Sequence, residues 1–340
     1  MVKVEYAFLL PEGQERENLG LDEGVRVTGA SSARTVCVGV VLALLAACVP
    51  REDPPPSPPE ALLGFLETTD FQVVPAGPGL AYYGLRNLTE PWAVHLLRVE
   101  LRRCELGFKV LEAPVAEGAA SGRSLVTELL ALEGEGALAG VNGDFFTPEG
   151  LPVGTEVVGG LTRRARDRPA FAWHPWYDPW MGTPKLEGDS VLVLGWDVSR
   201  SRSDGETEAI GGFPLLLRDG LRVGDLEVGE RPSFAAERHP RTAVGFDLDE
   251  KVLWVLVVDG RQPDYSAGMT LPELAALMEA LGVEEAINLD GGGSSVMVVD
   301  GITVSRPSDA EGERPVVNAL GIRRDPAFCR SRSNGPVRAP

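Results

Sequence analysis

The sequence predicts an α/β (α+β) fold in a single domain, with a C-terminal βαβ unit and flanking hairpins. Three observations support this class. Short β-type runs separated by turns begin at residue 79, residues 251–290 have the pattern strand, helix, strand, and two short turns in the last third predict hairpins. A chain of 340 residues that is 44% hydrophobic is long enough to bury a sizeable core. The net charge of −18 disfavours nucleic-acid binding, which needs a basic surface.

The N-terminal segment predicts export. An apolar run, Val36 to Ala47, follows Arg34 and is too short to span a bilayer. It ends in Leu45-Ala46-Ala47-Cys48, which resembles the lipobox of bacterial lipoproteins, so Cys48 is the expected lipidation site. An uncleaved anchor or a plain secretory signal is the alternative. The expected location is the bacterial cell envelope, lipid-anchored and facing the periplasm or the exterior.

These signals divide the chain into five parts. Residues 1–25 are interpreted as an over-extended gene start or a disordered extension, and 26–48 as a lipoprotein signal peptide. The Pro-rich stretch 49–60 is typical of an extended tether. The folded domain is expected over 61–330, with a disordered tail at 331–340.

The first half of the folded region reads mainly as strands. Strands are expected at 79–86, 92–101, 107–115, 136–146, 188–197 and 211–220, with a helix at 124–134. The stretch 136–146 breaks at Asn142-Gly143-Asp144, where an amide and a carboxylate could hold sugar hydroxyls or supply a second catalytic acid. Asn-Gly is also ordinary turn chemistry. The aromatic stretch 171–180 suits either sugar stacking or packing of a long loop.

The C-terminal third is the most regular part of the sequence. Residues 241–247 and 251–260 flank a short turn and predict an antiparallel hairpin. Thr270 and Glu273 form a capping box for a helix whose apolar face carries Leu271, Leu274, Leu277, Met278 and Leu281, and which ends at Gly282. A strand at 285–290 and a second hairpin at 296–305, turning at Asp300-Gly301, follow.

The two strands of the βαβ unit both end in an acid followed by glycine. They are expected to be parallel neighbours or near neighbours, and ligands bind beyond the carboxyl ends of such strands. Arg241 begins the antiparallel partner strand, so it lies opposite the end of the 251–258 strand. Arg241, Asp259, Arg261, Asp290 and the loop Gly291-Gly292-Gly293-Ser294 should therefore meet at one rim.

That rim suits an anion beside a carboxylate. Glycine amides and serine hydroxyls can donate to phosphate, and arginine can grip phosphate with two hydrogen bonds. A tight connection with no ligand is the simpler interpretation of GGGSS, but the arginine and the two acids favour a site. Walker A and nucleophile-elbow motifs do not match these residues.

Two cysteines, Cys104 and Cys329, remain after processing. In an oxidising compartment they allow one pairing, so a Cys104–Cys329 disulfide is expected. No Cys/His spacing typical of zinc is present.

At these residues the sequence resembles the phosphodiester glycosidase family. The matching stretches are 140–146, 211–220, 238–247, 257–298 and 314–322. The resemblance implies a mixed β-sheet core and hydrolysis of sugar-1-phosphodiesters. The family-like positions are Asn142, Asp144, Arg241, Thr242, Asp259, Arg261, Asp290, Gly291, Gly292, Ser294, Arg314 and Asn318.

The roles expected for these positions follow from the resemblance and from the rim. Asp290 is the expected general acid/base and Asp144 the second catalytic carboxylate. Phosphate would be held by Arg241, Arg314, Ser294 and the amides of Gly291, Gly292 and Gly293, and the sugar oriented by Asn142 and Asn318. Thr242, Asp259 and Arg261 complete the substrate site.

The predicted function is a hydrolase that cleaves the glycosidic C1–O bond of a sugar-1-phosphodiester in an extracellular or envelope glycan. The expected partners are a phosphorylated glycan and, through the lipid anchor, the membrane. No cofactor is required by this interpretation. Two alternatives remain: a non-catalytic phosphoglycan-binding lipoprotein, and a phosphodiesterase in which Asp144, Asp259 and Asp290 hold a divalent cation.

Overall fold

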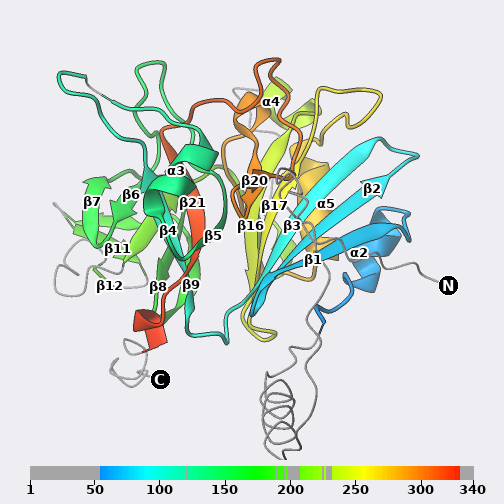
Figure 1. Ribbon diagram of the computed structural model, residues 1–340, viewed down its shortest axis with the longest axis horizontal. Coiled ribbons are helices and arrows are strands. Elements are labelled where there is room, and N and C mark those ends of the chain that lie inside the picture. The colour runs from blue at the N-terminus through cyan, green and yellow to red at the C-terminus, as the bar shows by residue number, and fades with distance from the viewer. Residues whose placement is uncertain are drawn as a thin grey trace, which may run out of the picture.

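Two large β-sheets packed face to face carry the fold (Figure 1). The computed structural model describes residues 54–119, 121–187, 190–193, 196–197, 207–223, 226 and 232–329. The first sheet has eight strands in the order β1 (Phe71–Gly77), β2 (Leu80–Asn87), β3 (Trp92–Glu100), β17 (Val252–Val258), β16 (Arg241–Asp247), β18 (Glu285–Asn288), β14 (Leu215–Arg218) and β15 (Leu221–Arg222).

The second sheet and two smaller sheets complete the β structure. The second sheet has five strands, β20 (Ile302–Thr303), β19 (Met297–Val299), β5 (Ala137–Asn142), β21 (Asn318–Arg324) and β4 (Leu106–Glu112). A third sheet also has five strands, β7 (Leu161–Arg164), β6 (Glu156–Val158), β13 (Glu208–Gly211), β8 (Ala170–His174) and β9 (Tyr177–Gly182). A small sheet has β10 (Lys185–Glu187), β11 (Ser190–Val193) and β12 (Trp196–Asp197).

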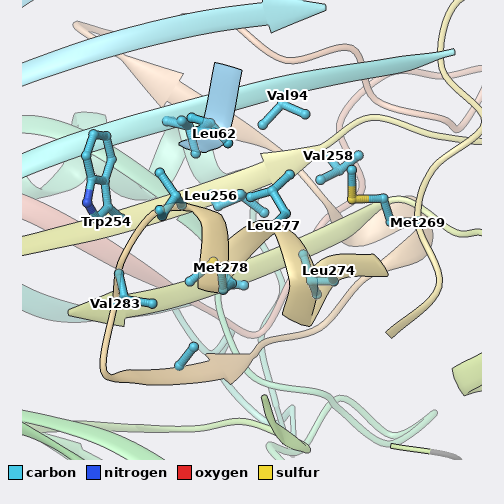
Figure 2. Close-up of a cluster of buried hydrophobic side chains, with 14 of the residues drawn as sticks. Leu62, Val94, Trp254, Leu256, Val258, Met269, Leu274, Leu277, Met278 and Val283 are labelled. Carbon is cyan, nitrogen blue, oxygen red and sulfur yellow. The ribbon is translucent and has the colours of Figure 1, made fainter. Parts of the chain in front are cut away.

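Alternation along β17 explains how the layers stack. Trp254, Leu256 and Val258 point to a core shared with helix α5 (Leu271–Ala280) and helix α2 (Glu60–Phe65). Figure 2 shows this cluster, with Leu62 of α2 and Leu277 of α5 against Leu256. The intervening side chains of β17 point to the second sheet, because successive residues of a strand face opposite sides.

The outer face of the second sheet is covered by helix α3 (Val126–Glu133), whose Val126, Leu129 and Leu130 pack on Val298 and Ala319. The order of layers is therefore helix, sheet, sheet, helix, in one domain. The short helix α4 (Pro232–Ala236) packs on α5.

The C-terminal βαβ unit and both hairpins form as expected. Thr270 Oγ1 accepts from Glu273 N, and a Glu273 carboxylate oxygen accepts from Thr270 N, which closes the capping box of α5. β17 and β18 run parallel to each other, but each is hydrogen-bonded to the antiparallel β16 that lies between them. The parallel component of the sheet thus consists of second neighbours, and the strand pairs among the described residues are antiparallel.

Several strands of the structure were not predicted from the sequence. β1 contains Pro75 and two glycines lie near its end, which weakened its strand signal. The third sheet was read only as an aromatic loop at 171–180. Its Trp173 is instead buried in the core, edge-on to Phe108 and Phe328, so this residue packs the fold rather than a sugar.

The expected start of the domain at residue 61 is slightly late. α2 begins at Glu60, and the carbonyl of Pro56 accepts a hydrogen bond of 2.9 Å from the Tyr83 hydroxyl. The end of the predicted tether therefore packs on the domain. The predicted signal peptide, Cys48 and the tail 331–340 lie outside the described residues. Among the helices described, none is both long and apolar enough to cross a membrane.

Candidate functional site

The strand ends meet at one rim of the eight-stranded sheet. Arg241, the first residue of β16, is in register with Val258 at the end of β17, and β18 ends on the other side of β16. A cavity of about 1210 Å³ opens there. It is lined by Phe145, Phe146, Thr147, Pro148, Val153, Arg168, Phe213, Ser233, Phe234, Glu237, His239, Arg241, Arg261, Asp290, Gly291 and Gly292.

Asp290 is one of two carboxylates among the described residues that line this cavity, and Glu237 is the other. Its backbone is fixed from both sides, because Asp290 N donates to Gly143 O at 3.0 Å and Asn142 Nδ2 donates to Asp290 O at 2.6 Å. Burial raises the pKa of the Asp290 carboxyl to about 6, while the Ser294 hydroxyl, the Gly291 amide and the Arg314 charge oppose the rise. Asp290 can therefore exchange a proton near neutral pH, as a general acid or base must.

Asp144 lies behind the cavity wall and is 3% exposed. Its Oδ2 accepts from Gly154 N at 2.6 Å. Burial is the main cause that raises the pKa of Asp144 to about 7; the amides of Gly154 and Phe145 and the Arg168 charge lower it, and the Asp290 charge adds to the rise. The charge of Asp290 thus acts on Asp144, but of these two predicted catalytic acids only Asp290 lines the cavity.

The glycines around Asp144 show how tightly it is enclosed. A Cβ atom on Gly154 would lie 2.9 Å from Asp144 Oδ2, and one on Gly211 would lie 2.7 Å from the same oxygen. Neither position tolerates a side chain without moving the carboxylate. Asp144 is therefore held between two chain segments rather than free to swing into the cavity.

Ser294 supplies a buried hydroxyl beside Asp290. It is 1% exposed, and among the described residues its Oγ has no hydrogen-bond partner of normal geometry. The hydroxyl is nevertheless close enough to the Asp290 carboxyl to lower that pKa.

Arg241 and Arg261 lie at the rim and are two of the three arginines that line the cavity, with Arg168 the third. Arg241 is 1% exposed and donates from Nε to Met269 O at 2.7 Å and from Nη2 to Phe234 O at 2.7 Å. Burial and the Arg261 charge lower the pKa of Arg241 to about 10, so the guanidinium stays charged at neutral pH. The Nε and Nη2 groups of Arg241 are thus engaged by backbone carbonyls, which leaves fewer of its donors for the expected two-bond grip on phosphate.

Arg261 has a left-handed backbone with φ of 58°. That conformation costs a non-glycine residue about 1–2 kcal/mol, and it is typically retained where the side chain must be placed in a particular way. The Arg261 guanidinium lies against Gly292, where a Cβ would come within 2.9 Å of Nη2. Of the two rim arginines, Arg261 is the one whose local backbone is strained.

Two of the three glycine amides expected to hold phosphate are engaged within the protein. Gly291 N donates to Asp290 Oδ1 at 2.9 Å and Gly292 N donates to Pro240 O at 2.9 Å. The three glycines instead allow close approach by three different neighbours. A Cβ on Gly291 would meet the Pro240 carbonyl at 2.8 Å, one on Gly292 would meet Arg261, and one on Gly293 would overlap Arg314.

Asn142, expected to orient the sugar, and Thr242, expected in the substrate site, instead connect the two sheets behind the cavity. Thr242 Oγ1 donates to Asn142 Oδ1 at 2.8 Å, and both side chains are fully buried. Asn142 Oδ1 also accepts from Val296 N at 3.1 Å, while its Nδ2 holds the Asp290 carbonyl. Both residues position the Asp290 loop.

Asn318 and Arg314 likewise act through neighbours. Asn318 Oδ1 accepts from Asp144 N at 2.9 Å, and its Nδ2 donates to Glu156 Oε1 at 2.5 Å. Arg314 forms an ion pair with Asp309 at 2.7 Å and packs on Gly293, so it reaches Asp290 only through its charge. Both were expected to touch the substrate, and neither lines the cavity formed by the described residues.

Asp259 is separated from the cavity by strand alternation. Arg241 lies on the α5 face of the sheet, whereas Asp259, one residue beyond its register partner Val258, lies on the face toward the second sheet. There Asp259 Oδ2 is 2.9 Å from His95 Nε2, and Oδ1 accepts from Arg306 N. The expected gathering of Asp259 with Asp290 at one binding site is therefore wrong.

The distance between Asp259 and the cavity also disfavours a metal centre built from the three predicted aspartates. Asp144, Asp259 and Asp290 do not come together as a ligand set in the described part of the chain. The three-residue cluster found there, Cys104, Glu105 and Cys329, contains the disulfide. The structure joins Cys104 and Cys329, with their Cα atoms 4.7 Å apart.

Sequence reasoning missed most of the cavity wall. No role in the site was assigned from the sequence to the four phenylalanines of the wall, which are Phe145, Phe146, Phe213 and Phe234. Arg168 stacks over the Phe213 ring at 4.9 Å and lowers the pKa of Asp144, yet nothing in its surrounding sequence marks it. His239 does line the cavity, and burial, with Arg241 and Arg261, lowers its pKa below the ordinary value.

Known proteins share this fold and parts of this sequence. The chain is 31% identical over 216 residues to the bovine (Bos taurus) N-acetylglucosamine-1-phosphodiester alpha-N-acetylglucosaminidase. The matched region covers 59% of this chain and 38% of the bovine protein. The chain thus spans less than two fifths of the length of that relative.

Two solved structures show the same fold at low identity. A hypothetical protein from Synechocystis gives a TM-score of 0.59 at 16% identity, covering 75% of this chain and 64% of that one. The catalytic domain of the zebrafish N-acetylglucosamine-1-phosphodiester alpha-N-acetylglucosaminidase, auto-inhibited by its pro-peptide, gives 0.54 at 24% identity, covering 81% of this chain and 96% of that domain.

A family model described as phosphodiester glycosidase matches residues 135–323, which is more than half of the chain. This range contains the Asp290 loop, both rim arginines and Asp144. The chain belongs to the phosphodiester glycosidase family.

Proposed function

We propose that this protein hydrolyses the glycosidic C1–O bond of a sugar-1-phosphodiester in an envelope or extracellular glycan. The observation that carries the proposal is the position of Asp290. Its carboxyl, with a pKa raised to about 6, lines the same cavity as the guanidinium groups of Arg168, Arg241 and Arg261. Family membership favours the same chemistry.

In the proposed reaction, phosphate is the leaving group. The C1–O bond breaks with its electron pair going to oxygen, and the growing negative charge is stabilised by the cavity arginines. Water supplies the new oxygen at C1, and the Asp290 carboxylate accepts the proton that this water loses. A phosphate leaving group needs no protonation, so one base suffices. Burial also raises the pKa of Asp144, behind the cavity wall, and so favours its neutral form.

Hydrolysis in oxygen-18 water tests this assignment. A set of sugar-1-phosphodiesters is expected to yield free sugar labelled at the anomeric oxygen, together with an unlabelled phosphomonoester. Label on phosphate would identify a phosphoesterase and refute the proposal. Binding without turnover of any member would favour the phosphoglycan-binding alternative.

The metal-dependent alternative has less support from the geometry, because Asp259 lies on the opposite face of the sheet from Arg241. It predicts that a chelator abolishes turnover and that an added divalent cation restores it. The envelope location rests on residues 26–48 and on Cys48, and a mature N-terminus upstream of Cys48 would contradict it.

Arg261→Ala is expected to lower kcat/KM by about tenfold to a hundredfold, because a lost charge-assisted hydrogen bond typically costs about 1.5–3 kcal/mol. The loss should be smaller for Arg261→Lys, which keeps the charge but loses the two-pronged geometry. Steady-state kinetics on the best phosphodiester measures both variants.

Arg306→Ala is the matched control, since Arg306 stacks on Tyr265 and lies outside the cavity. If the Arg261→Ala variant has the same kcat/KM as the Arg306→Ala control, Arg261 does not bind the phosphate.

A further inference from the structure

Half-buried phenyl rings make up much of the cavity wall. Phe145, Phe146, Phe213 and Phe234 all line it, together with Pro148 and Val153. Phenylalanine carries no hydroxyl, so these rings can offer a ligand only apolar contact or contact with the ring face. A sugar ring could stack on these faces, but its hydroxyls would find no donors or acceptors on the rings themselves.

Two of these rings have no role in the core of the domain. Phe146 and Phe234 also pack against core clusters, but Phe145 and Phe213 belong to none of the clusters that the described residues form. Phe145 meets Phe234 edge-on at 5.9 Å, and Phe213 lies under the Arg168 guanidinium. Their partly exposed surfaces therefore face the cavity without a packing reason.

Most polar groups of the cavity come from other chain segments than these rings, although Arg168 lies over the Phe213 ring at 4.9 Å. The segment 145–153 follows the second sheet and carries a single polar side chain toward the cavity, that of Thr147. Glu237, His239, Arg241 and Arg261 come from the α4–β16 region and from the end of β17, and Asp290 follows β18. The lining therefore has a mainly apolar wall and a charged wall, which meet where Arg168 lies over Phe213.

The volume exceeds what a sugar phosphate requires. Sites for drug-sized molecules commonly enclose about 300–1,000 Å³, and this cavity measures about 1210 Å³. If the sugar and phosphate occupy the charged wall beside Asp290, room remains along the apolar wall for a further organic group.

We propose that this wall, formed by Phe145, Phe146, Pro148, Val153 and Phe213, binds the alcohol part of the substrate, and that this alcohol is hydrophobic. The substrate class is then a sugar-1-phosphodiester of a long-chain or aromatic alcohol rather than of a second sugar. This inference rests on the proposed glycosidase function. It narrows the substrate by the chemistry of the wall, because each apolar group moved from water onto these rings contributes to binding.

A homologous series of alcohols tests the proposal on the wild-type chain. Sugar-1-phosphodiesters of methanol, butanol and hexanol are compared with one whose alcohol is a second sugar. We expect kcat/KM to rise at least tenfold from methyl to hexyl, since one fully buried methylene contributes up to about fourfold. Equal values along the series, or a preference for the sugar alcohol, would overturn the subsite.

Variants locate the effect. Phe145→Ala and Phe213→Ala should each lower the hexyl-to-methyl ratio of kcat/KM severalfold. Phe65→Ala is the matched control, because Phe65 is a partly buried phenylalanine that stacks on Trp92 outside the cavity. Its ratio should equal that of the wild type, and an equal fall in all three variants would overturn the assignment.

A binding measurement separates this inference from the proposed reaction. Titration calorimetry with hexyl phosphate and methyl phosphate requires no turnover. Tighter binding of hexyl phosphate by at least tenfold, without hydrolysis of any diester, would support the apolar subsite and refute the hydrolase. Turnover of the diesters with equal binding of both monoesters would refute the subsite alone.

Discussion

Asp290→Asn is expected to lower kcat by about a hundredfold to ten-thousandfold, the usual range for losing a general acid or base. The amide keeps the size of the side chain and can still accept from Gly291 N, so the loop should retain its conformation. In the wild type, kcat/KM should rise with pH through about 6, because the carboxylate is the active form and the pKa of Asp290 is raised to about that value. In the Asp290→Asn variant, kcat/KM should not show this rise with pH.

Steady-state kinetics from pH 4.5 to 8.5 measures both effects, with circular dichroism to verify folding. Asp300→Asn is the control: Asp300 sits in the β19–β20 turn with φ of 49°, a conformation that asparagine also adopts readily. A folded Asp290→Asn protein with the kcat of the control would remove Asp290 from the chemistry.

Loss of the Cys104–Cys329 bridge has the second largest expected effect. The bridge closes a loop of 225 residues, and the loop-entropy model gives about 5 kcal/mol for such a closure, with measured values often lower. It lies just beyond the β4–β21 ladder, where Arg324 is in register with Leu106. Removing it frees the C-terminal end of β21 to separate from β4.

Denaturant unfolding with and without reductant measures this contribution. The Cys104→Ala/Cys329→Ala double variant should unfold at the lower, reduced midpoint under both conditions. Identical midpoints for the oxidised and reduced wild type would show that the bridge contributes nothing to the free energy of unfolding.

Local signals in the sequence were enough to predict the C-terminal third. The capping box at Thr270 and Glu273, the five apolar positions of α5 and the short turns of both hairpins depend on neighbouring residues alone. The third sheet was not predictable in this way. Its strands are three to six residues long, and β13 finds its partners β6 and β8 across long intervening segments.

The sequence predicted which strand ends meet at the site, but not the face of the sheet to which each side chain there points. The register of β16 with β17 and β18 correctly brought Arg241 and Asp290 to one rim. Successive side chains of a strand face opposite sides of the sheet, and this decides which of them point to the cavity. For this reason Asp259 contacts His95 and Thr242 contacts Asn142. The apolar wall could not be anticipated, because Phe213 joins Phe145 and Phe146 from a distant part of the chain and no motif links the two segments.

The strand order of the second sheet has a consequence for how the chain reaches its native state. β4, made of residues 106–112, pairs with β21 at 318–324, and β5 pairs with β21 on the other side. Neither β4 nor β5 can complete its ladder before almost the whole described chain has been synthesised. Such non-local pairing slows folding and leaves strand edges open to other chains in the meantime. Synthesis and folding of this protein are therefore separate events in time, and a ribosome-bound fragment that stops before Asn318 should be susceptible to proteolysis along both strands.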